Sequence, residues 1–179
     1  IIAVRAHTAE PLNSRWYTGG GLFRDVTLVA TSPITWFERH PLYITTTDNR
    51  IVEIQAEIAT RARINEVPMR TIVRDADGTV VYESTKQIPI NRKWRTMELK
   101  TDSFVVENPR LWSCESPHLY TASIAILDAK GAVMDSVAHT FGIRTIEFSP
   151  EYGMKLNGEK VILKGIANHP ERISVGEYI

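Results

Sequence analysis

Turn-forming residue pairs divide this chain into short segments of strand-forming residues, and this punctuation restricts its fold more than any other feature. The pairs are Asp48-Asn49, Asp77-Gly78, Lys130-Gly131 and Asn157-Gly158. Each is flanked by residues rich in Val, Ile, Thr and aromatic side chains. Asn, Asp and Gly tolerate the positive φ angles that tight β-hairpin turns require. The chain is therefore predicted to be all-β, an antiparallel sandwich of the immunoglobulin type.

Alternating apolar and polar side chains indicate the individual strands. Apolar residues recur at every second position from 52 to 58, and the segments 69–74 and 79–83 flank the Asp77-Gly78 turn as a paired hairpin. The stretch 51–62 also fits helical spacing, with Asp48 placed as an N-cap. We favour the strand because of its four consecutive period-2 matches and its β-branched neighbours.

The segment from Asn108 to Tyr120 contains two prolines and two large aromatic residues. Proline fixes φ and has no backbone donor, so the segment is predicted to be a stiff crossing loop and not a central strand or helix. Trp112 and Tyr120 are expected to anchor it. The alternation that starts at Tyr120 predicts that the loop leads directly into a half-buried strand.

Val161-Ile162-Leu163 is continuously apolar, without a polar alternate face. A strand of this kind is expected to be covered on both sides, as parallel strands of an α/β barrel are. A buried core strand of the sandwich fits the same pattern, and periodicity alone does not separate the two interpretations.

The composition excludes some functions. Lys plus Arg (21) equals Asp plus Glu (21) among the 179 residues, so no overall basic field would attract nucleic acid or an anionic membrane surface. No apolar run is long enough to span a membrane. The opening residues, Ile1 to Arg5, carry neither a start methionine nor a charged head before an apolar stretch, so the location, periplasmic or cytoplasmic, is left open.

Two pairs of side chains are candidates for catalytic groups. The single cysteine, Cys114, and His118 share the proline loop, but no third orienting group or helix terminus accompanies them, so we favour a structural role. Glu53 and Glu57 share the polar face of a strand, where paired carboxylates are usually solvated surface. No catalytic residue is therefore assigned within this chain.

Phosphate and metal sites are not indicated. The glycines at 19–21 are not followed by the Lys-Ser/Thr of a phosphate-binding loop. The five histidines are scattered singly, without the spacing of a metal site. We therefore expect no cofactor and no metal.

Three groups of residues, in order along the chain, resemble a signature of the three-domain glycoside hydrolases of the β-galactosidase and β-glucuronidase family, glycoside hydrolase family 2. The first runs from Ser14 to Val26, with an Arg-Trp pair, a glycine turn and the sequence Phe-Arg-Asp-Val. The second is the loop from Asn108 to Tyr120. The third comprises Phe141-Gly142-Ile143-Arg144, Leu156-Asn157-Gly158, Leu163-Lys164-Gly165 and Asn168-His169.

The resemblance implies a domain plan. Residues 1–30 would be the end of a jelly-roll, sugar-binding-like domain, 31–144 a complete immunoglobulin-like sandwich, and 145–179 the start of a (β/α)8 catalytic barrel. The chain would then be a fragment whose partners are its own jelly-roll and barrel domains, and the parent enzyme could form an oligomer. Its substrate would be a carbohydrate.

The same resemblance implies where the chemistry lies. Retaining glycosidases use two carboxyl groups about 5 Å apart, one as acid/base and one as nucleophile. In this family both are glutamates of later barrel strands, beyond Ile179, so the fragment alone is predicted to be inactive. Only Asn13 and His169 are expected to reach substrate, and only in the intact enzyme, where Asn13 replaces the acidic residue that binds a monovalent cation in galactosidases.

The loop form Leu111-Trp112 to Leu119-Tyr120 resembles that of β-galactosidases and β-glucuronidases and not that of β-mannosidases, and the triplet Arg24-Asp25-Val26 favours a β-galactosidase parent. The competing hypothesis is a stand-alone immunoglobulin-like module that binds carbohydrate or protein. It explains the sandwich equally well but not the motifs at both ends that match flanking domains.

Overall fold

The computed structural model describes residues 2–5, 26–91, 93 and 95–166. The chain divides into two compact units, one of Ala30–Ile162 and one of Ile1–Val29 together with Leu163–Ile179. The described residues of the second unit have no regular secondary structure. Within the described ranges, no helix is long and apolar enough to cross a membrane.

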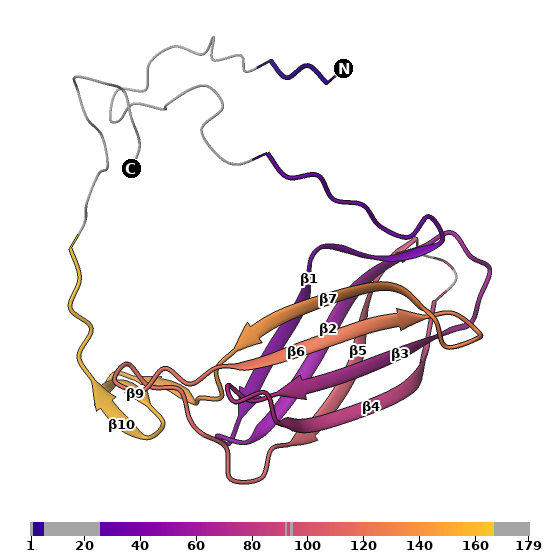
Figure 1. The fold of residues 1–179 in the computed structure, drawn as a ribbon. Helices are drawn as coiled ribbons and strands as arrows, with labels where there is room; N and C mark the ends of the chain where they lie inside the picture. The colour runs from indigo at the N-terminus through magenta and orange to yellow at the C-terminus, as the bar shows by residue number, and fades with distance from the viewer. Residues whose placement is uncertain (1, 6–25, 92, 94, 167–179) are drawn as a thin grey trace. The chain divides into compact units, whose positions relative to one another are not determined.

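The unit of Ala30–Ile162 is built from antiparallel strands, and its main body is a two-layer sandwich (Figure 1). One sheet has the order β1-β2-β5 and the other the order β4-β3-β6-β7. The chain changes sheet after β2, returns for β5 and changes again for β6. The prediction of an all-β antiparallel sandwich is confirmed. The sandwich strands are β1 (Thr35–Thr47), β2 (Ile51–Thr60), β3 (Glu66–Arg74), β4 (Val80–Pro89), β5 (Thr96–Val105), β6 (Tyr120–Leu127) and β7 (Val133–Phe141).

The turn pairs that the sequence singles out connect neighbouring strands. Asp48 and Asn49 have φ angles of 50° and 56° between β1 and β2, where the register continues from Thr47 opposite Ile51. The connection has three residues, 48–50, and the Arg50 N–H donates to the Thr47 carbonyl at 3.1 Å; Asn and Asp reach the positive φ of this turn at low cost. Gly78 and Gly131, with φ of 85° and 83°, complete the turns between β3 and β4 and between β6 and β7.

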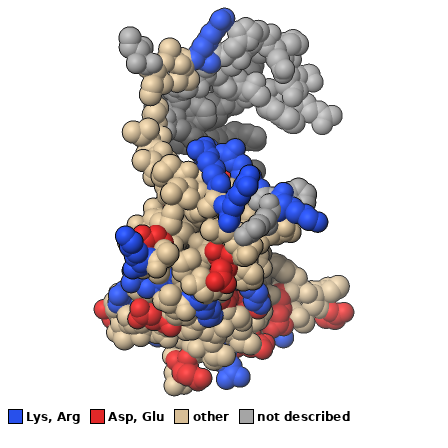
Figure 2. All heavy atoms as spheres, turned by 90° about the vertical axis from the view of Figure 1, so that its right-hand side faces the viewer, with Lys and Arg blue, Asp and Glu red and all other residues tan. Residues whose placement is uncertain are grey.

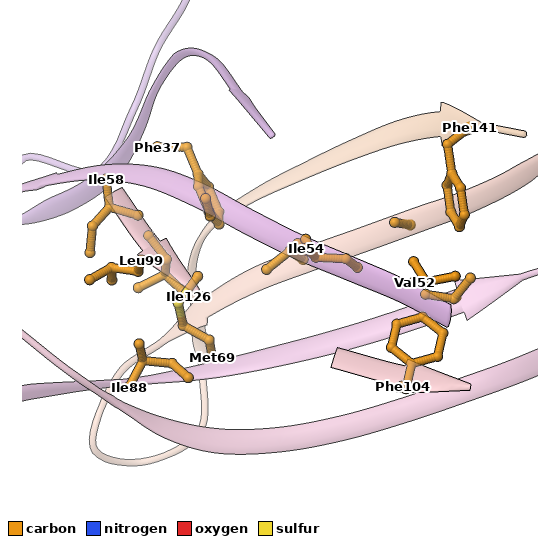
Figure 3. Close-up of a cluster of buried hydrophobic side chains, with 14 of the residues drawn as sticks. Phe37, Val52, Ile54, Ile58, Met69, Ile88, Leu99, Phe104, Ile126 and Phe141 are labelled. Carbon is orange, nitrogen blue, oxygen red and sulfur yellow. The ribbon is translucent and has the colours of Figure 1, made fainter. Parts of the chain in front are cut away.

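The core lies between the two sheets and is made of the inward-facing side chains of both (Figure 3). Ile54 and Ile58 on β2 and Ile126 on β6 are fully buried. Burying one such side chain stabilises the fold by about 1.5–3 kcal/mol. The alternation of buried and half-buried residues from Ile51 to Ile58 confirms the strand interpretation and excludes the helix.

The strand that follows the proline loop also has the predicted alternation. Tyr120, Ala122, Ile124 and Ile126 on β6 are all buried, and the opposite face includes the exposed Ser123. Strand β6 pairs with β3 on one side and β7 on the other, so it is a central strand of its sheet.

Residues 146–161 form a separate small sheet with the order β10-β9-β8. The sequence predicts that the apolar run 161–163 is a strand covered on both sides. In the structure only Val161 belongs to a strand, and Ile162 and Leu163 are 74% and 71% exposed. Asn157 and Gly158, with φ of 54° and 85°, form a two-residue turn that makes the pairing antiparallel. Its strands are β8 (Ile146–Ser149), β9 (Gly153–Leu156) and β10 (Glu159–Val161).

Candidate functional site

The two residues predicted to reach substrate, Asn13 and His169, lie outside the described residues. The Gly19–Gly21 turn lies outside them as well. The roles of Asn13 and His169 stay predictions.

Cys114 and His118 lie in the loop between β5 and β6. The ring Nε2 of His118 is 2.9 Å from the hydroxyl oxygen of Ser116. The Ser116 carbonyl accepts a hydrogen bond from the backbone N–H of Ser113 at 3.0 Å, which closes a tight turn. Cys114 is exposed. Among the described residues, no three His, Cys, Asp or Glu side chains are grouped so that they could hold a metal ion.

Trp112 is the centre of a corner that joins this loop to the end of β7. Its backbone N–H donates to the carbonyl of Ile143 at 2.9 Å, and the Arg144 guanidinium lies 4.6 Å from its ring centroid, within the range of a cation–π contact. The backbone of Gly142 passes so close that a Cβ there would be 2.7 Å from the Trp112 Cβ. Glycine is required at this position by space and not by its φ angle.

Asn157 extends the corner to the small sheet. Its side-chain amide donates to the Trp112 carbonyl at 3.0 Å. Its backbone N–H donates to the Thr145 carbonyl at 2.8 Å, and its Oδ1 accepts from the Thr145 N–H at 3.0 Å. The Trp112 corner, defined as Trp112, Gly142, Arg144 and Asn157, therefore fixes the β9–β10 turn against the sandwich.

Tyr120 is the second anchor of the loop, as the sequence predicts. Its ring is buried 5.8 Å from that of Phe141, and its hydroxyl accepts a hydrogen bond from the backbone N–H of Arg110 at 2.8 Å. A tyrosine at the start of this strand that bonds to backbone a few residues upstream is a hallmark of immunoglobulin-like sandwiches. The loop is thus an architectural element.

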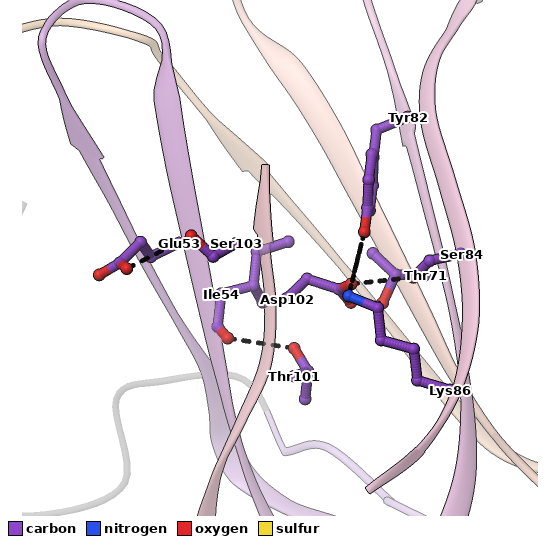
Figure 4. A network of polar contacts seen from close by, with 9 residues as sticks. All are labelled: Glu53, Ile54, Thr71, Tyr82, Ser84, Lys86, Thr101, Asp102 and Ser103. Carbon is purple, nitrogen blue, oxygen red and sulfur yellow. Dashed lines mark hydrogen bonds and ion pairs between the residues drawn. The ribbon is translucent and has the colours of Figure 1, made fainter. Parts of the chain in front are cut away.

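A buried carboxylate joins the two sheets at one edge of the sandwich (Figure 4). Asp102 on β5 is 3% exposed and accepts four hydrogen bonds from β3 and β4 of the other sheet. The donors are the Thr71 hydroxyl (2.5 Å), the Tyr82 hydroxyl (2.7 Å), the Ser84 hydroxyl (2.8 Å) and the Lys86 ammonium (2.5 Å). We call these five residues the Asp102 network.

The network sets the charges of its own members. Burial by itself would raise the pKa of Asp102, but the hydrogen bonds, that from Lys86 first, outweigh it and hold the pKa below its usual value. The hydrogen bond to Asp102 raises the pKa of Lys86. The pair is therefore ionised across the ordinary pH range. Beside it, the rings of Tyr82 and Phe104 stack with centroids 3.8 Å apart, which adds apolar contact between β4 and β5.

Sequence reasoning missed Asp102, although a signal for it is present. Buried apolar residues occupy odd positions at Met97 and Leu99 on β5 and then even positions at Phe104 on β5 and at Val106, just after it. The register between β2 and β5 shifts here: Lys100 lies opposite Gln55, and Asp102, two residues later on β5, lies opposite Ile54, which is only one residue away on β2. The extra residue is Thr101, so Thr101 and Asp102 both face inward. A change of phase in the alternation would have indicated the bulge.

The carboxylates that were weighed on the surface have ordinary surroundings. Glu53 accepts hydrogen bonds from the ammonium of Lys100 at 2.6 Å and the hydroxyl of Ser103 at 3.4 Å, and the Lys100 contact lowers the pKa of Glu53. Glu57 lies opposite Glu98 in the β2–β5 register, on the outer face of the sheet. Glu57 and Glu98 line an open hollow of about 340 Å³ together with His40.

Known proteins are similar to this chain in sequence. The family described as Glycosyl hydrolases family 2 matches residues 39–144, which correspond closely to the sandwich. A protein of Formosa agariphila, provisionally named a beta-glucuronidase, is 34% identical over 98% of this chain and 16% of its own length. Beta-galactosidase BoGH2A of Bacteroides ovatus is 29% identical over 94% of this chain and 20% of its own length.

A solved structure agrees with the sequence comparisons. The crystal structure of a glycosyl hydrolase family 2 member from Bacteroides cellulosilyticus is 29% identical and superposes with a TM-score of 0.75, over 90% of this chain and 22% of that one. The chain thus spans about a fifth of the length of the relatives it matches.

Proposed function

From the premise that the chain belongs to glycosyl hydrolase family 2, we propose that it supplies the non-catalytic sandwich of a retaining, exo-acting glycoside hydrolase that removes terminal β-linked sugars. The observation that carries this proposal is the match of the family to residues 39–144, the range of the sandwich itself.

The chemistry of the described residues supports a scaffold role. Retaining glycosidases need two carboxyl groups about 5 Å apart that flank the scissile bond. Here Asp102 is used to join two sheets, Glu53 binds Lys100, and Asp77 binds Arg110 at 2.9 Å on the surface. The catalytic glutamate pair would come from barrel strands beyond Ile179.

The proposed domain plan places the sandwich between two larger partners. Residues 1–30 would end a jelly-roll domain and residues 145–179 would begin the barrel, so both partners belong to the same full-length chain. The exposed apolar side chains of Ile2, Leu28, Leu163 and Ile166 are consistent with neighbours of this kind. Asn13 and His169 would contribute to the sugar pocket there.

A β-galactosidase is the proposed parent, on the sequence triplet Arg24-Asp25-Val26, because the form of the loop around Trp112 is shared by β-galactosidases and β-glucuronidases. The relatives named above include both a beta-galactosidase and a provisional beta-glucuronidase, so the sugar has to be measured. The residues that would read the sugar's hydroxyl or carboxylate groups belong to the barrel.

The test is an aryl-glycoside panel on two proteins in parallel, the full-length protein and the chain of residues 1–179. We expect the full-length protein to hydrolyse the β-galactoside faster than the β-glucuronide and β-mannoside, and residues 1–179 to hydrolyse none. Turnover by residues 1–179 would refute the scaffold role. A full-length protein that binds these sugars without cleaving any would support the alternative of a stand-alone binding module.

A further inference from the structure

A hollow on the outer face of the β1-β2-β5 sheet combines an exposed aromatic ring with several hydrogen-bonding groups. Its volume is about 340 Å³, and its lining comes from all three strands. We call it the Tyr43 hollow. The aromatic and polar side chains that line it are His40, Tyr43, Gln55, Glu57 and Glu98.

The register of the three strands brings these groups together. Tyr43 lies opposite Gln55 on β2, and Glu57 lies opposite Glu98 on β5. Gln55 and Glu57 share the outer face of β2, because the residue between them, Ala56, is buried on the core side. Strands hold such side chains at fixed separations, so the groups of the hollow are positioned before a ligand arrives.

An irregular part of β1 completes the lining. Residues 38–41 form a bulge, since all of them lie opposite the single residue Glu57 of β2. Within the bulge His40 has a φ angle of 59°, in the left-handed region that few non-glycine residues adopt. Bulges of this kind re-aim side chains and are frequent beside functional sites. Here the bulge brings His40 and Pro41 into the hollow.

The side chains of the hollow are open to a ligand. Tyr43 is 64% exposed. In the part of the chain that the structure describes, the side chains of His40, Gln55, Glu57 and Glu98 form no hydrogen bond or ion pair with the protein. Carboxylates accept hydrogen bonds, whereas an amide both donates and accepts them. The hollow therefore offers both kinds of hydrogen-bonding group to a ligand.

The charge of the lining is unlike that of the surface in general. Figure 2 shows that Lys and Arg side chains are interspersed with Asp and Glu over the visible face of the sandwich and gather at one end of it. The lining of the Tyr43 hollow includes two carboxylates and no Lys or Arg. An anionic ligand is therefore disfavoured, because like charges repel.

We propose that the Tyr43 hollow binds a neutral oligosaccharide. A sugar ring has an apolar face of C–H groups, which packs on an aromatic ring such as that of Tyr43. Its hydroxyl groups donate charge-assisted hydrogen bonds to carboxylates such as Glu57 and Glu98, and they both donate to and accept from the Gln55 amide. The volume is at the lower end of the range of about 300–1,000 Å³ that is typical of small-molecule pockets. The choice of a sugar rests on the proposed function.

Two other classes of ligand fit the hollow less well. The opposed carboxylates attract cations, but the described residues contain no group of three His, Cys, Asp or Glu side chains that could hold a metal ion. A basic protein partner would meet Glu57 and Glu98 at the floor of a concave site, whereas glutamate is depleted at the centre of protein interfaces. Neither ligand makes use of the amide of Gln55.

The test is titration of residues 1–179, followed by calorimetry and by the NMR shifts of the backbone amides. The neutral ligands are β-linked trisaccharides of galactose, glucose and mannose. The comparison ligands are a trisaccharide of galacturonic acid, calcium chloride and trilysine. The site variants are Tyr43→Ala and Glu57→Gln, and Tyr43→Phe is the conservative variant. The control is Phe148→Ala on β8, which removes a ring that is 73% exposed.

We expect at least one neutral trisaccharide to bind and to shift amides of β1, β2 and β5. Tyr43→Ala and Glu57→Gln should each weaken its binding at least about tenfold, because they remove the stacking ring and a charged acceptor. Tyr43→Phe should keep most of the affinity, since it keeps the ring. Phe148→Ala should bind as the parent does, and thermal unfolding should show that all variants are folded.

Several results would overturn the proposal. These are absence of binding by all three neutral trisaccharides, amide shifts confined to other strands, equal weakening in Phe148→Ala, and tighter binding of the acidic trisaccharide. Calcium that binds more tightly than every neutral trisaccharide would overturn it in favour of a cation site. Trilysine that does so would overturn it in favour of a basic protein partner.

Failure here is distinguishable from failure of the proposed function. Cleavage of aryl glycosides by the full-length protein tests the proposed function, and a full-length protein that cleaves none would contradict it, whatever the titration shows. A full-length protein that cleaves glycosides, together with residues 1–179 that bind no trisaccharide, would contradict only the assignment of the Tyr43 hollow.

Discussion

The Trp112 corner and the Asp102 network both hold the sandwich unit together with polar contacts, but they use different physics. The corner relies on close backbone approach and neutral hydrogen bonds, such as that from Asn157 to the Trp112 carbonyl. The network relies on a buried charge with four donors from the opposite sheet. The stability that the corner contributes should therefore depend on side-chain volume and not on pH. The stability that the network contributes should depend on pH and less on side-chain volume.

Removing the buried carboxylate should have the largest effect. Asp102→Ala leaves the Lys86 ammonium and the buried Thr71 hydroxyl without their acceptor, and breaking a buried charged pair costs about 3–5 kcal/mol. We expect urea denaturation to show a loss at the lower end of that range, because Lys86 is partly exposed. Glu53→Ala, which removes a surface partner of Lys100, is the control and should leave the unfolding midpoint unchanged. Equal midpoints for the two variants would show that the buried charge contributes nothing special.

Adding a side chain at Gly142, where the backbone contacts Trp112, should cause the next largest loss of stability. Gly142→Ala places a methyl group against Trp112, and overpacking of this kind costs about 1–3 kcal/mol. Gly165→Ala is the control, since a methyl group there meets nothing within 4 Å. In a Trp112→Ala background the cost of Gly142→Ala should shrink, which a double-mutant cycle measures. An unchanged cost in that background would mean that Trp112 does not set the requirement for glycine.

Lowering the pH should change the stability contributed by the Asp102 network but not that contributed by the Trp112 corner. The pKa of Asp102 is lowered by folding, so its contribution is complete above its unfolded pKa, about 3.9, and is lost as pH falls through the lower folded value. The stability difference between the parent and Asp102→Asn should therefore narrow on acidification below about pH 4. Lys86 acts at the other end: its raised pKa keeps its contribution through pH 10, and the contribution is lost as pH rises through the folded value. The loss of stability in Gly142→Ala should not change with pH. If it narrowed below about pH 4 as the loss in Asp102→Asn does, the two regions would not differ in their pH dependence.

The tyrosine of the loop provides a smaller test. Tyr120→Phe keeps the buried ring but removes the acceptor for the Arg110 N–H, for an expected loss of about 1 kcal/mol. Tyr43→Phe, at a largely exposed tyrosine, is the matched control. A loss no larger than that of the control would show that the hydrogen bond does not stabilise the loop.

The smallest effect is expected where like charges meet on the surface. Glu57 and Glu98 are opposite in the β2–β5 register, and directly opposed like charges are destabilising by about 0.2–1 kcal/mol. Glu98→Gln should therefore raise the unfolding midpoint slightly at low salt, and the gain should vanish at high salt. Glu83→Gln, another strand carboxylate, should give no such gain. A loss of stability in Glu98→Gln would show that the pair is held by a favourable interaction.

The same contrast explains how much could be predicted from the sequence. The turns at Asp48-Asn49 and Asn157-Gly158 and the strand from Ile51 to Thr60 follow from local chemistry and alternation, and the structure confirms them. The anchoring by Trp112 and Tyr120 also followed from one short segment. These features depend on residues that are close together in the sequence.

The network could not be predicted in the same way. Thr71 and Asp102 are brought together only by the packing of two sheets, and the inward turn of Asp102 depends on the bulge at Thr101. In the apolar run 161–163, only Val161 lies in a strand, because the adjacent Asn157-Gly158 turn pairs that residue antiparallel with Met154.

The most direct measurement concerns the catalytic residues, which we propose to lie beyond residue 179 of the parent enzyme. A retaining glycosidase forms a covalent glycosyl-enzyme intermediate, which a 2-fluoro glycoside of the preferred sugar traps. Peptide mass spectrometry of the labelled full-length protein then locates the nucleophile. We expect a label on a glutamate beyond Ile179 and none within residues 1–179. A label on any residue within 1–179 would show that the nucleophile belongs to this chain and that the proposed scaffold role is wrong.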